Sequence, residues 1–203
     1  MEDQEIEVKF YVQNISRVEQ RLIALGAELS QPRTLETNLR FDTPQGDLAR
    51  SFQVLRLRQD TAARLTYKGP AHGDDGVRVR QEIEFIVSDF GAAQRLLEAL
   101  GYQIGMIYEK YRAQYELPGL HIALDEMPYG NFVEIEGPDS TTIQALSAKL
   151  GLNWRASVQA SYTMLFQNLQ TEHKLPFRDL SFDNFQNLLV TDEMLHVVPA
   201  DMV

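Results

Sequence analysis

Charged residues recur at every second position along several short stretches of this chain, and they are the residues that could do chemistry. The first stretch is Glu5-Ile6-Glu7-Val8-Lys9-Phe10, in which charged and apolar side chains alternate. A period of two is typical of a β-strand, whose successive side chains point to opposite faces of a sheet. Two carboxylates on one face repel each other, so they need either open water or a cation between them.

The same alternation returns in later stretches, often as pairs of like charge two residues apart. The charged positions are Glu5, Glu7, Lys9, Arg56, Arg58, Lys68, Arg78, Arg80, Glu82, Glu84, Lys110, Arg112, Asp125, Glu134 and Glu136. The positions between them are mostly apolar, as in Leu55 and Leu57. The plainer interpretation is the solvated face of an antiparallel sheet, which is the ordinary place of a charged strand face. The recurrence of like-sign pairs on many strands favours a second interpretation.

In the second interpretation, about eight antiparallel strands close into a barrel, with the charged faces inward and the apolar faces under outer helices. A lumen that holds both signs at this density needs a ligand and ions to neutralise it. Arginine suits phosphate because its planar guanidinium binds two oxygens at once. Carboxylates suit hard divalent cations such as Mg²⁺ or Mn²⁺. If the strands close in this way, the implied ligand is a polyanion with many oxygens, and the charge count fits a bound triphosphate.

Periodicity, caps and turn residues predict the elements that position these side chains. We expect strands over 4–12, 54–58, 64–68, 77–87, 106–116, 120–126 and 132–136, and a further extended stretch over 27–42 broken at Pro32. Helices are expected over about 16–26, 88–100, 141–150 and 157–169. We assign residues 1–170 to one domain and residues 171–203 to a C-terminal tail that is irregular or partly helical.

Composition narrows the class of protein. The chain has 203 residues, no cysteine, a net charge of -10 and 44% hydrophobic residues, which fits a globular domain without disulfides or thiolate metal sites. An acidic surface repels nucleic acid and anionic membranes, so neither is expected as a partner. We find neither a secretory signal nor a stretch long enough to span a bilayer, and we expect a cytoplasmic protein.

Several motifs follow one another in a fixed order over roughly residues 4–167. They are Glu5-Ile6-Glu7-Val8-Lys9, Leu55-Arg56-Leu57-Arg58, Tyr67-Lys68-Gly69-Pro70, Arg80-Gln81-Glu82-Ile83-Glu84, Glu109-Lys110-Tyr111-Arg112, Leu124-Asp125, Gly130-Asn131-Phe132-Val133-Glu134-Ile135-Glu136 and Ser161-Tyr162. This series resembles the CYTH family, the triphosphate tunnel metalloenzymes. One ExExK motif alone is weak evidence, whereas the ordered series is specific.

The resemblance implies an α+β protein, a closed eight-stranded antiparallel barrel with a charged interior and helices on the outside. This barrel is a tunnel that binds triphosphates, and matching positions imply the roles of its residues. The implied metal ligands, for Mg²⁺ or Mn²⁺, are Glu5, Glu7, Asp125, Glu134 and Glu136. The implied triphosphate ligands are Lys9, Arg56, Arg58, Lys68, Arg80, Lys110 and Arg112, with Glu82 and Glu84 completing the lumen. The implied catalytic residues are Glu5, Glu7, Lys9 and Glu136.

One departure from the family pattern lies near the end of the similarity. Many relatives carry lysine or arginine directly before the Ser-Tyr pair, whereas this chain has Gln159-Ala160 there. The last basic contact to the phosphates is therefore missing, or it is supplied by Arg155, Lys174 or Arg178.

Family members hydrolyse inorganic triphosphate, thiamine triphosphate or RNA 5′-triphosphates, or act as class IV adenylate cyclases. We expect a metal-dependent triphosphatase that acts on a small-molecule triphosphate. The first alternative is a class IV adenylate cyclase that converts ATP to cyclic AMP and pyrophosphate. The second is a non-catalytic module that binds polyphosphate or nucleotide, although the presence of all five carboxylates argues against it. An outer strand edge or the tail could mediate a homodimer.

Overall fold

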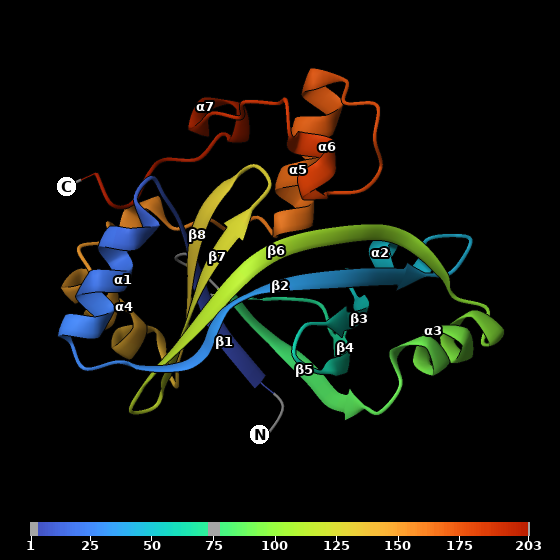
Figure 1. The fold of residues 1–203 in the computed structure, drawn as a ribbon, viewed down its shortest axis with the longest axis horizontal. Helices are drawn as coiled ribbons and strands as arrows, with labels where there is room; N and C mark the ends of the chain where they lie inside the picture. Colours follow the sequence, from blue (N-terminus) through green and yellow to red (C-terminus); the bar gives the residue numbers. More distant parts are fainter. Residues whose placement is uncertain (1–3, 73–77, 203) are drawn as a thin grey trace.

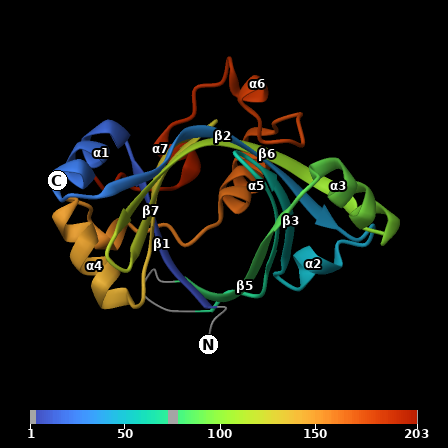
Figure 2. The same cartoon turned by 60° about the horizontal axis from the view of Figure 1, so that its bottom comes forward.

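Eight antiparallel strands form one closed ring in the computed structural model, which describes residues 4–72 and 78–202 apart from the side chains of Gln4, Glu5 and Arg78. The strands are β1 (Gln4–Val12), β2 (Glu28–Asp42), β3 (Val54–Gln59), β4 (Ala63–Lys68), β5 (Arg78–Val87), β6 (Gln103–Leu117), β7 (Leu120–Met127) and β8 (Gly130–Glu136). Their order around the ring is β1-β5-β4-β3-β2-β6-β7-β8, and β8 pairs with β1 (Figures 1 and 2). The predicted closed antiparallel barrel is confirmed.

The helices are α1 (Ile15–Ala24), α2 (Asp47–Arg50), α3 (Phe90–Ala99), α4 (Ser140–Lys149), α5 (Tyr162–His173), α6 (Phe182–Phe185) and α7 (Asp192–Leu195), with a 3-10 turn at Trp154–Ala156. Helices α1, α3 and α4 lie on the outside of the ring, as expected, whereas α5 lies across its opening in the view of Figure 2 and its first residues line the interior cavity. The side chains of Asn14, Asp89 and Asp139 cap α1, α3 and α4 by accepting a backbone N–H from the first turn. No helix of the described chain has the length and apolar content that crossing a bilayer requires.

The apolar outer face of β1 packs under two of these helices. Val8 and Phe10 are completely buried and share one cluster with Val18 and Leu22 of α1 and Ile143 of α4. Burying a side chain of this size is worth about 1.5–3 kcal/mol, so the alternation in β1 holds the helices against the barrel. This burial turns the other face of β1, with Glu7 and Lys9, toward the interior.

The outer face of β5 departs from the expectation that every apolar strand face lies under a helix. Ile83 and Phe85 are 43% and 54% exposed. The contacts explain the difference, because α3 packs on β3 and β4 rather than on β5, through a cluster that contains Leu57 and Leu97.

Two predicted boundaries are wrong. The extended stretch 27–42 is a single strand, because the pairing of β2 with β6 absorbs Pro32 in register shifts between Leu29 and Thr34. The last long helix begins at Tyr162 rather than near 157, because Ser157 forms a bridge with Phe10 of β1. The hydroxyl of Ser161 then caps the helix by accepting the N–H of Met164.

The segment after α5 folds back onto the barrel. Backbone hydrogen bonds of 2.9 Å join Leu180 to Ile107 and Glu109, so this segment adjoins β6 in the part that β7 does not reach. Farther on, the carboxylate of Asp201 accepts the backbone N–H groups of Gln13 and Asn14, at 2.9 and 2.8 Å, just before α1. Residues 171–202 therefore cover an outer surface, and none of them lines the interior cavity described below.

Candidate active site

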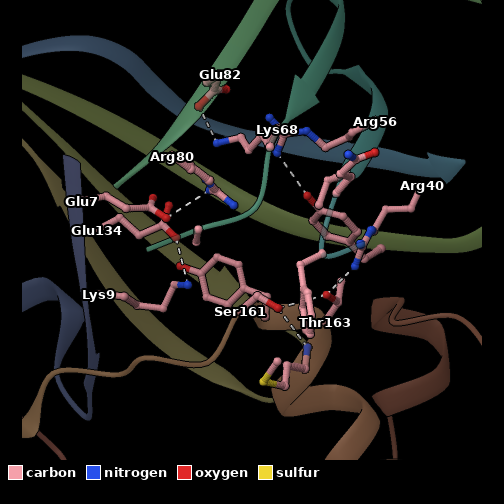
Figure 3. Close-up of a pocket in the computed structure, with 18 of the residues that line it drawn as sticks. Glu7, Lys9, Arg40, Arg56, Lys68, Arg80, Glu82, Glu134, Ser161 and Thr163 are labelled. Carbon is pink, nitrogen blue, oxygen red and sulfur yellow. Dashed lines mark hydrogen bonds and ion pairs between the residues drawn. The ribbon is translucent and has the colours of Figure 1, made fainter. Parts of the chain in front are cut away.

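A cavity of about 1030 Å³ lies in the interior of the barrel. The predicted residues that line it are Glu7, Lys9, Arg56, Arg58, Lys68, Arg80, Glu82, Glu84, Lys110, Arg112, Glu134 and Glu136. Figure 3 shows how such side chains converge from strands far apart in the sequence. Asp125 is fully buried behind this lining, and the side chain of Glu5 lies outside the described part of the chain.

A buried network on β6, β7 and β8 orients the cations of one wall. The guanidinium of Arg112 donates to Asp125, with 2.6 Å from Nε to Oδ1, and also contacts Glu134. Asp125 further accepts the ammonium of Lys110 at 3.1 Å and the hydroxyl of Tyr162 at 2.8 Å. Glu134 forms an ion pair with Lys9 at 3.3 Å, its register partner across β1 and β8. Two carboxylates, Asp125 and Glu134, thus fix the positions of three cationic side chains. The three positive charges outnumber these two carboxylates.

A second set of pairs orders the cations on β3, β4 and β5. Arg58 contacts Glu84 at 3.1 Å, and Lys68 contacts Glu82 at 2.6 Å. The hydroxyl of Thr66 donates to Glu84 at 2.7 Å. Lys68 and Glu82 are also register partners, so their proximity follows directly from the pairing of β4 with β5.

Glu36 is a buried carboxylate that sequence reasoning missed. It is completely buried on β2, accepts the amide of Asn38 at 2.9 Å, and lies 3.5 Å from both Arg58 and Lys110. Burial alone would raise the pKa of Glu36, but Lys110, Arg112 and Arg58 together bring it well below its usual range. Burial opposes ionisation of Glu134 in the same way, and Lys9 and Arg112 hold its pKa well below the usual range.

These lowered pKa values predict how stability responds to acid. A carboxylate with a lower pKa in the folded than in the unfolded protein stabilises the fold above the unfolded pKa of about 4.5, and this stability is lost as the pH falls toward the folded pKa. We expect the free energy of unfolding, measured by urea denaturation, to decline below about pH 4.5. In Glu36→Gln the decline should be shallower, because one of the responsible groups is gone. An equally steep decline in that variant would contradict the assignment.

One pair of carboxylates in the cavity fits a divalent cation. Glu7 and Glu136 are directly opposite each other across β1 and β8, and both line the cavity. Like charges in this position destabilise a sheet unless a cation lies between them, and carboxylate oxygens suit Mg²⁺ and Mn²⁺. Within residues 4–72 and 78–202, no three His, Cys, Asp or Glu side chains converge as ligands. The pair therefore fits a hard cation that completes its coordination with water or phosphate oxygens.

The other predicted metal ligands lie in different surroundings. Glu7 also accepts Arg80 at 3.1 Å, and Glu134 is bonded to Lys9 and Arg112. Asp125 accepts three donors in a site without exposed surface. Metal ligation by Asp125 and Glu134 stays a prediction, and the contacts give both residues a second role, the orientation of basic side chains.

The proposed substitutes for the missing basic residue are misplaced. Arg155, Lys174 and Arg178 do not line the cavity, and Arg178 instead pairs with the adjacent Asp179. Arg40 on β2 does line it, and its guanidinium donates to the hydroxyl of Thr163 at 2.5 Å, close to Ser161. The signal was present in the sequence, because alternate positions of the extended stretch are polar. These positions are Thr34, Glu36, Asn38, Arg40 and Asp42.

The barrel and its lining define a class of protein, a closed antiparallel tunnel whose interior carries a dense set of basic and acidic side chains. The chain belongs to the CYTH family, since the profile of the CYTH domain matches residues 3–150. The comparison with curated proteins found no match.

Solved structures share this fold. A Vibrio parahaemolyticus protein named as a candidate adenylate cyclase is 23% identical with a TM-score of 0.71, and the match covers 81% of this chain and 98% of that one. The PH1012 protein of Pyrococcus horikoshii is 27% identical, with a TM-score of 0.66 and coverage of 78% and 96%. A Hippeastrum protein, named as a candidate adenylyl cyclase with a dominant triphosphatase activity, is 21% identical, with a TM-score of 0.61 and coverage of 80% and 95%.

Proposed function

We propose that this chain is a divalent-metal-dependent triphosphatase that hydrolyses a small-molecule triphosphate inside the barrel. The observation that carries the proposal is the composition of the cavity wall. Among the residues that the structure describes, eight basic side chains line it, and a pair of glutamates lies across β1 and β8. The basic residues are Lys9, Arg40, Arg56, Arg58, Lys68, Arg80, Lys110 and Arg112. Such a wall is complementary to a chain of phosphates that carries its own metal ion.

The basic side chains would bind and orient the phosphate chain. Arg58 and Arg112 are held by buried carboxylates, so their guanidinium groups lose little further freedom when a phosphate binds. Preorganised donors of this kind stabilise the charge that accumulates on a leaving phosphate. Lys9 is held in the same way by Glu134, with its ammonium 4.1 Å from the centre of the Tyr162 ring.

Glu7 and Glu136 would hold the metal. When bound there, Mg²⁺ or Mn²⁺ would neutralise phosphate charge and lower the pKa of a water molecule. A smaller cavity of about 90 Å³ adjoins the same residues, and Glu7, Glu134 and Glu136 line both spaces. This second space is large enough to hold water. Water, the nucleophile of a hydrolysis, would therefore be available on the side of the main cavity where the glutamates lie.

The proposal is tested by giving the purified protein inorganic triphosphate, thiamine triphosphate and ATP separately, with Mg²⁺ or Mn²⁺. Orthophosphate release and cyclic AMP are both measured. Metal-dependent release of orthophosphate from a triphosphate supports the proposal. Cyclic AMP formation from ATP without orthophosphate release from any triphosphate would exclude it.

Class IV adenylate cyclase is the second candidate, and one feature of the cavity mouth favours a substrate with an organic group. Phe52 lines the cavity, is 75% exposed, and has a φ of 55°, a backbone conformation that non-glycine residues rarely adopt. Met164 lines the same cavity and is 47% exposed. An adenine or thiamine ring could stack on Phe52 while its phosphates reach the basic wall.

Phe52→Ala is expected to raise the KM for ATP or thiamine triphosphate by about 3–10-fold and to leave the KM for inorganic triphosphate unchanged. The reason is that only the organic group can use the aromatic face, and such a contact is worth about 0.5–1.5 kcal/mol. The control is Leu189→Ala, which removes an apolar side chain that is 85% exposed and lies outside the cavity. Equal changes for organic and inorganic substrates would show that Phe52 does not contact the organic group.

A further inference from the structure

Two like-charged pairs lie on opposite walls of the barrel. Arg40 of β2 and Arg56 of β3 are directly opposite in the register of their strands, and both line the cavity. Glu7 of β1 and Glu136 of β8 are likewise directly opposite each other in the register of their strands. In the order of the ring, β2 is four strands from β1 in either direction, and β3 is likewise four strands from β8. The arginine pair therefore lies on the wall opposite the glutamate pair.

Arg40 differs from the other cations of this wall in its partners. Each of the other seven basic side chains that line the cavity has a carboxylate within ion-pair distance. For Arg40, the described residues supply no such carboxylate, and its hydrogen-bond partner is the hydroxyl of Thr163. Burial lowers the pKa of Arg40, and the charge of Arg56 lowers it further, although neighbouring Tyr108 and the carboxylate of Asp42 act in the opposite direction.

Arg56 is also incompletely satisfied. Its guanidinium donates to two neutral hydroxyl groups, those of Tyr108 at 3.1 Å and Thr66 at 3.3 Å, and Glu84 lies 3.6 Å away. Its buried Nε has no hydrogen-bond partner within the described chain. Two arginines opposite each other, held mainly by hydroxyls, leave positive charge and donor capacity directed at the space between them.

The side chains around Arg40 complete a concave set of donors. The hydroxyls of Ser161 and Thr163 lie 3.2 Å apart, and Arg40 lies beside Thr163 and donates to its hydroxyl (Figure 3). Each hydroxyl has one O–H group, and this group can donate to an anion oxygen whenever it is not donating to a neighbouring side chain. Arg40 and the two hydroxyls thus meet at the place where α5 begins, and Arg56 lies opposite Arg40 on the neighbouring strand.

We propose that Arg40, Arg56, Ser161 and Thr163 form a subsite for an outer phosphate of the bound phosphate chain. Arg40 thereby takes the place of the basic residue that many relatives carry before the Ser-Tyr pair. This inference rests on the proposed triphosphate function, and it adds the orientation of the phosphate chain in the cavity. One end of the phosphate chain lies against the arginine pair, and the metal-binding glutamates act from the opposite wall.

The test is titration calorimetry of inorganic tripolyphosphate into the protein with EDTA present, so that binding is read without metal or turnover. Arg40→Gln should raise the Kd by about 10-fold or more, the scale of a lost charge-assisted hydrogen bond. Arg40→Lys, which keeps the charge, should lie between this variant and the wild type. The matched control is Arg33→Gln on the same strand, whose side chain is exposed and pairs with Glu126 outside the cavity. It should bind as the wild type does. ATP should be weakened like tripolyphosphate, since the phosphate chain is the part that they share.

The thermal midpoint of the ligand-free protein provides a second readout. Removing one of two facing arginines relieves repulsion, so Arg40→Gln should have a Tm equal to or above the wild type, while the rise in Tm on adding tripolyphosphate should shrink. An unchanged Kd in Arg40→Gln would overturn the subsite and leave the proposed function intact. Weaker binding with a lower ligand-free Tm would also overturn it, because Arg40 would then be structural. Failure of the wild type to bind tripolyphosphate at all, with and without metal, would overturn the proposed function together with the subsite.

Discussion

Replacing Glu7 with glutamine is expected to reduce the turnover of the triphosphate substrate by at least about 100-fold, the scale on which one preorganised electrostatic group acts in an active site. Glu7 faces Glu136 across two strands, and this pair is the part of the cavity that fits a divalent cation. Glutamine keeps the size of the side chain and one oxygen, but it removes the charge that a hard cation requires. The fold should survive, because the amide oxygen of the new side chain can still accept from Arg80.

The measurement combines turnover at saturating Mg²⁺ with a direct titration of Mn²⁺ binding in the absence of substrate. Glu116→Gln is the matched control, since this glutamate lies on a strand, is 54% exposed at its side chain and does not line the cavity. We expect weakened Mn²⁺ binding in Glu7→Gln alone. If Mn²⁺ binds both variants equally, the metal assignment of Glu7 is wrong.

Asp125→Ala should lower the free energy of unfolding by about 3–5 kcal/mol, the usual cost of removing one partner from a buried ion pair. Asp125 has no exposed surface and accepts hydrogen bonds from Lys110, Arg112 and Tyr162. Without it, two cations and a hydroxyl lose their common acceptor in the interior. Asp125→Asn should cost less, because the amide oxygen can keep part of this bonding.

Urea denaturation at neutral pH is the measurement, and an exposed ion pair in the same protein provides the comparison. Arg33 and Glu126 also form a two-point pair, but their side chains are 53% and 33% exposed. Glu126→Ala should therefore cost only about 0–1 kcal/mol. A loss of similar size in the two alanine variants would show that the buried network does not stabilise the fold.

The charged lining could be predicted because β-strand alternation is a local property. Once Val8 and Phe10 are placed under helices, Glu7 and Lys9 must face the other way, whatever the rest of the chain does. The same reasoning correctly placed Arg56 and Arg58 in the interior. What it could not supply is which charge meets which, since the pairing of Lys9 with Glu134 depends on the register of strands that are distant in sequence.

The residues that were missed share one cause. β2 carries both Glu36 and Arg40 toward the interior, but Pro32 made the stretch look broken and its polar positions were not grouped with those of the other strands. A proline in a long strand is tolerated where the pairing shifts register, and this shift cannot be read from one strand alone. For Asp125 the position in the interior was predicted from the sequence. Its three hydrogen-bond donors could not be predicted, because they come together only in the folded structure.

The closure of the ring has a consequence for the order in which the molecule can form on the ribosome. β1 is synthesised first, yet its partners β5 and β8 begin at residues 78 and 130, and the backbone of Tyr11 is bonded to Ala200. The edges of β1 must therefore stay unpaired until β5 and β8 have been synthesised, a state that is prone to mispairing. The charges of Glu5, Glu7 and Lys9 would then protect the nascent chain from aggregation before they serve any ligand.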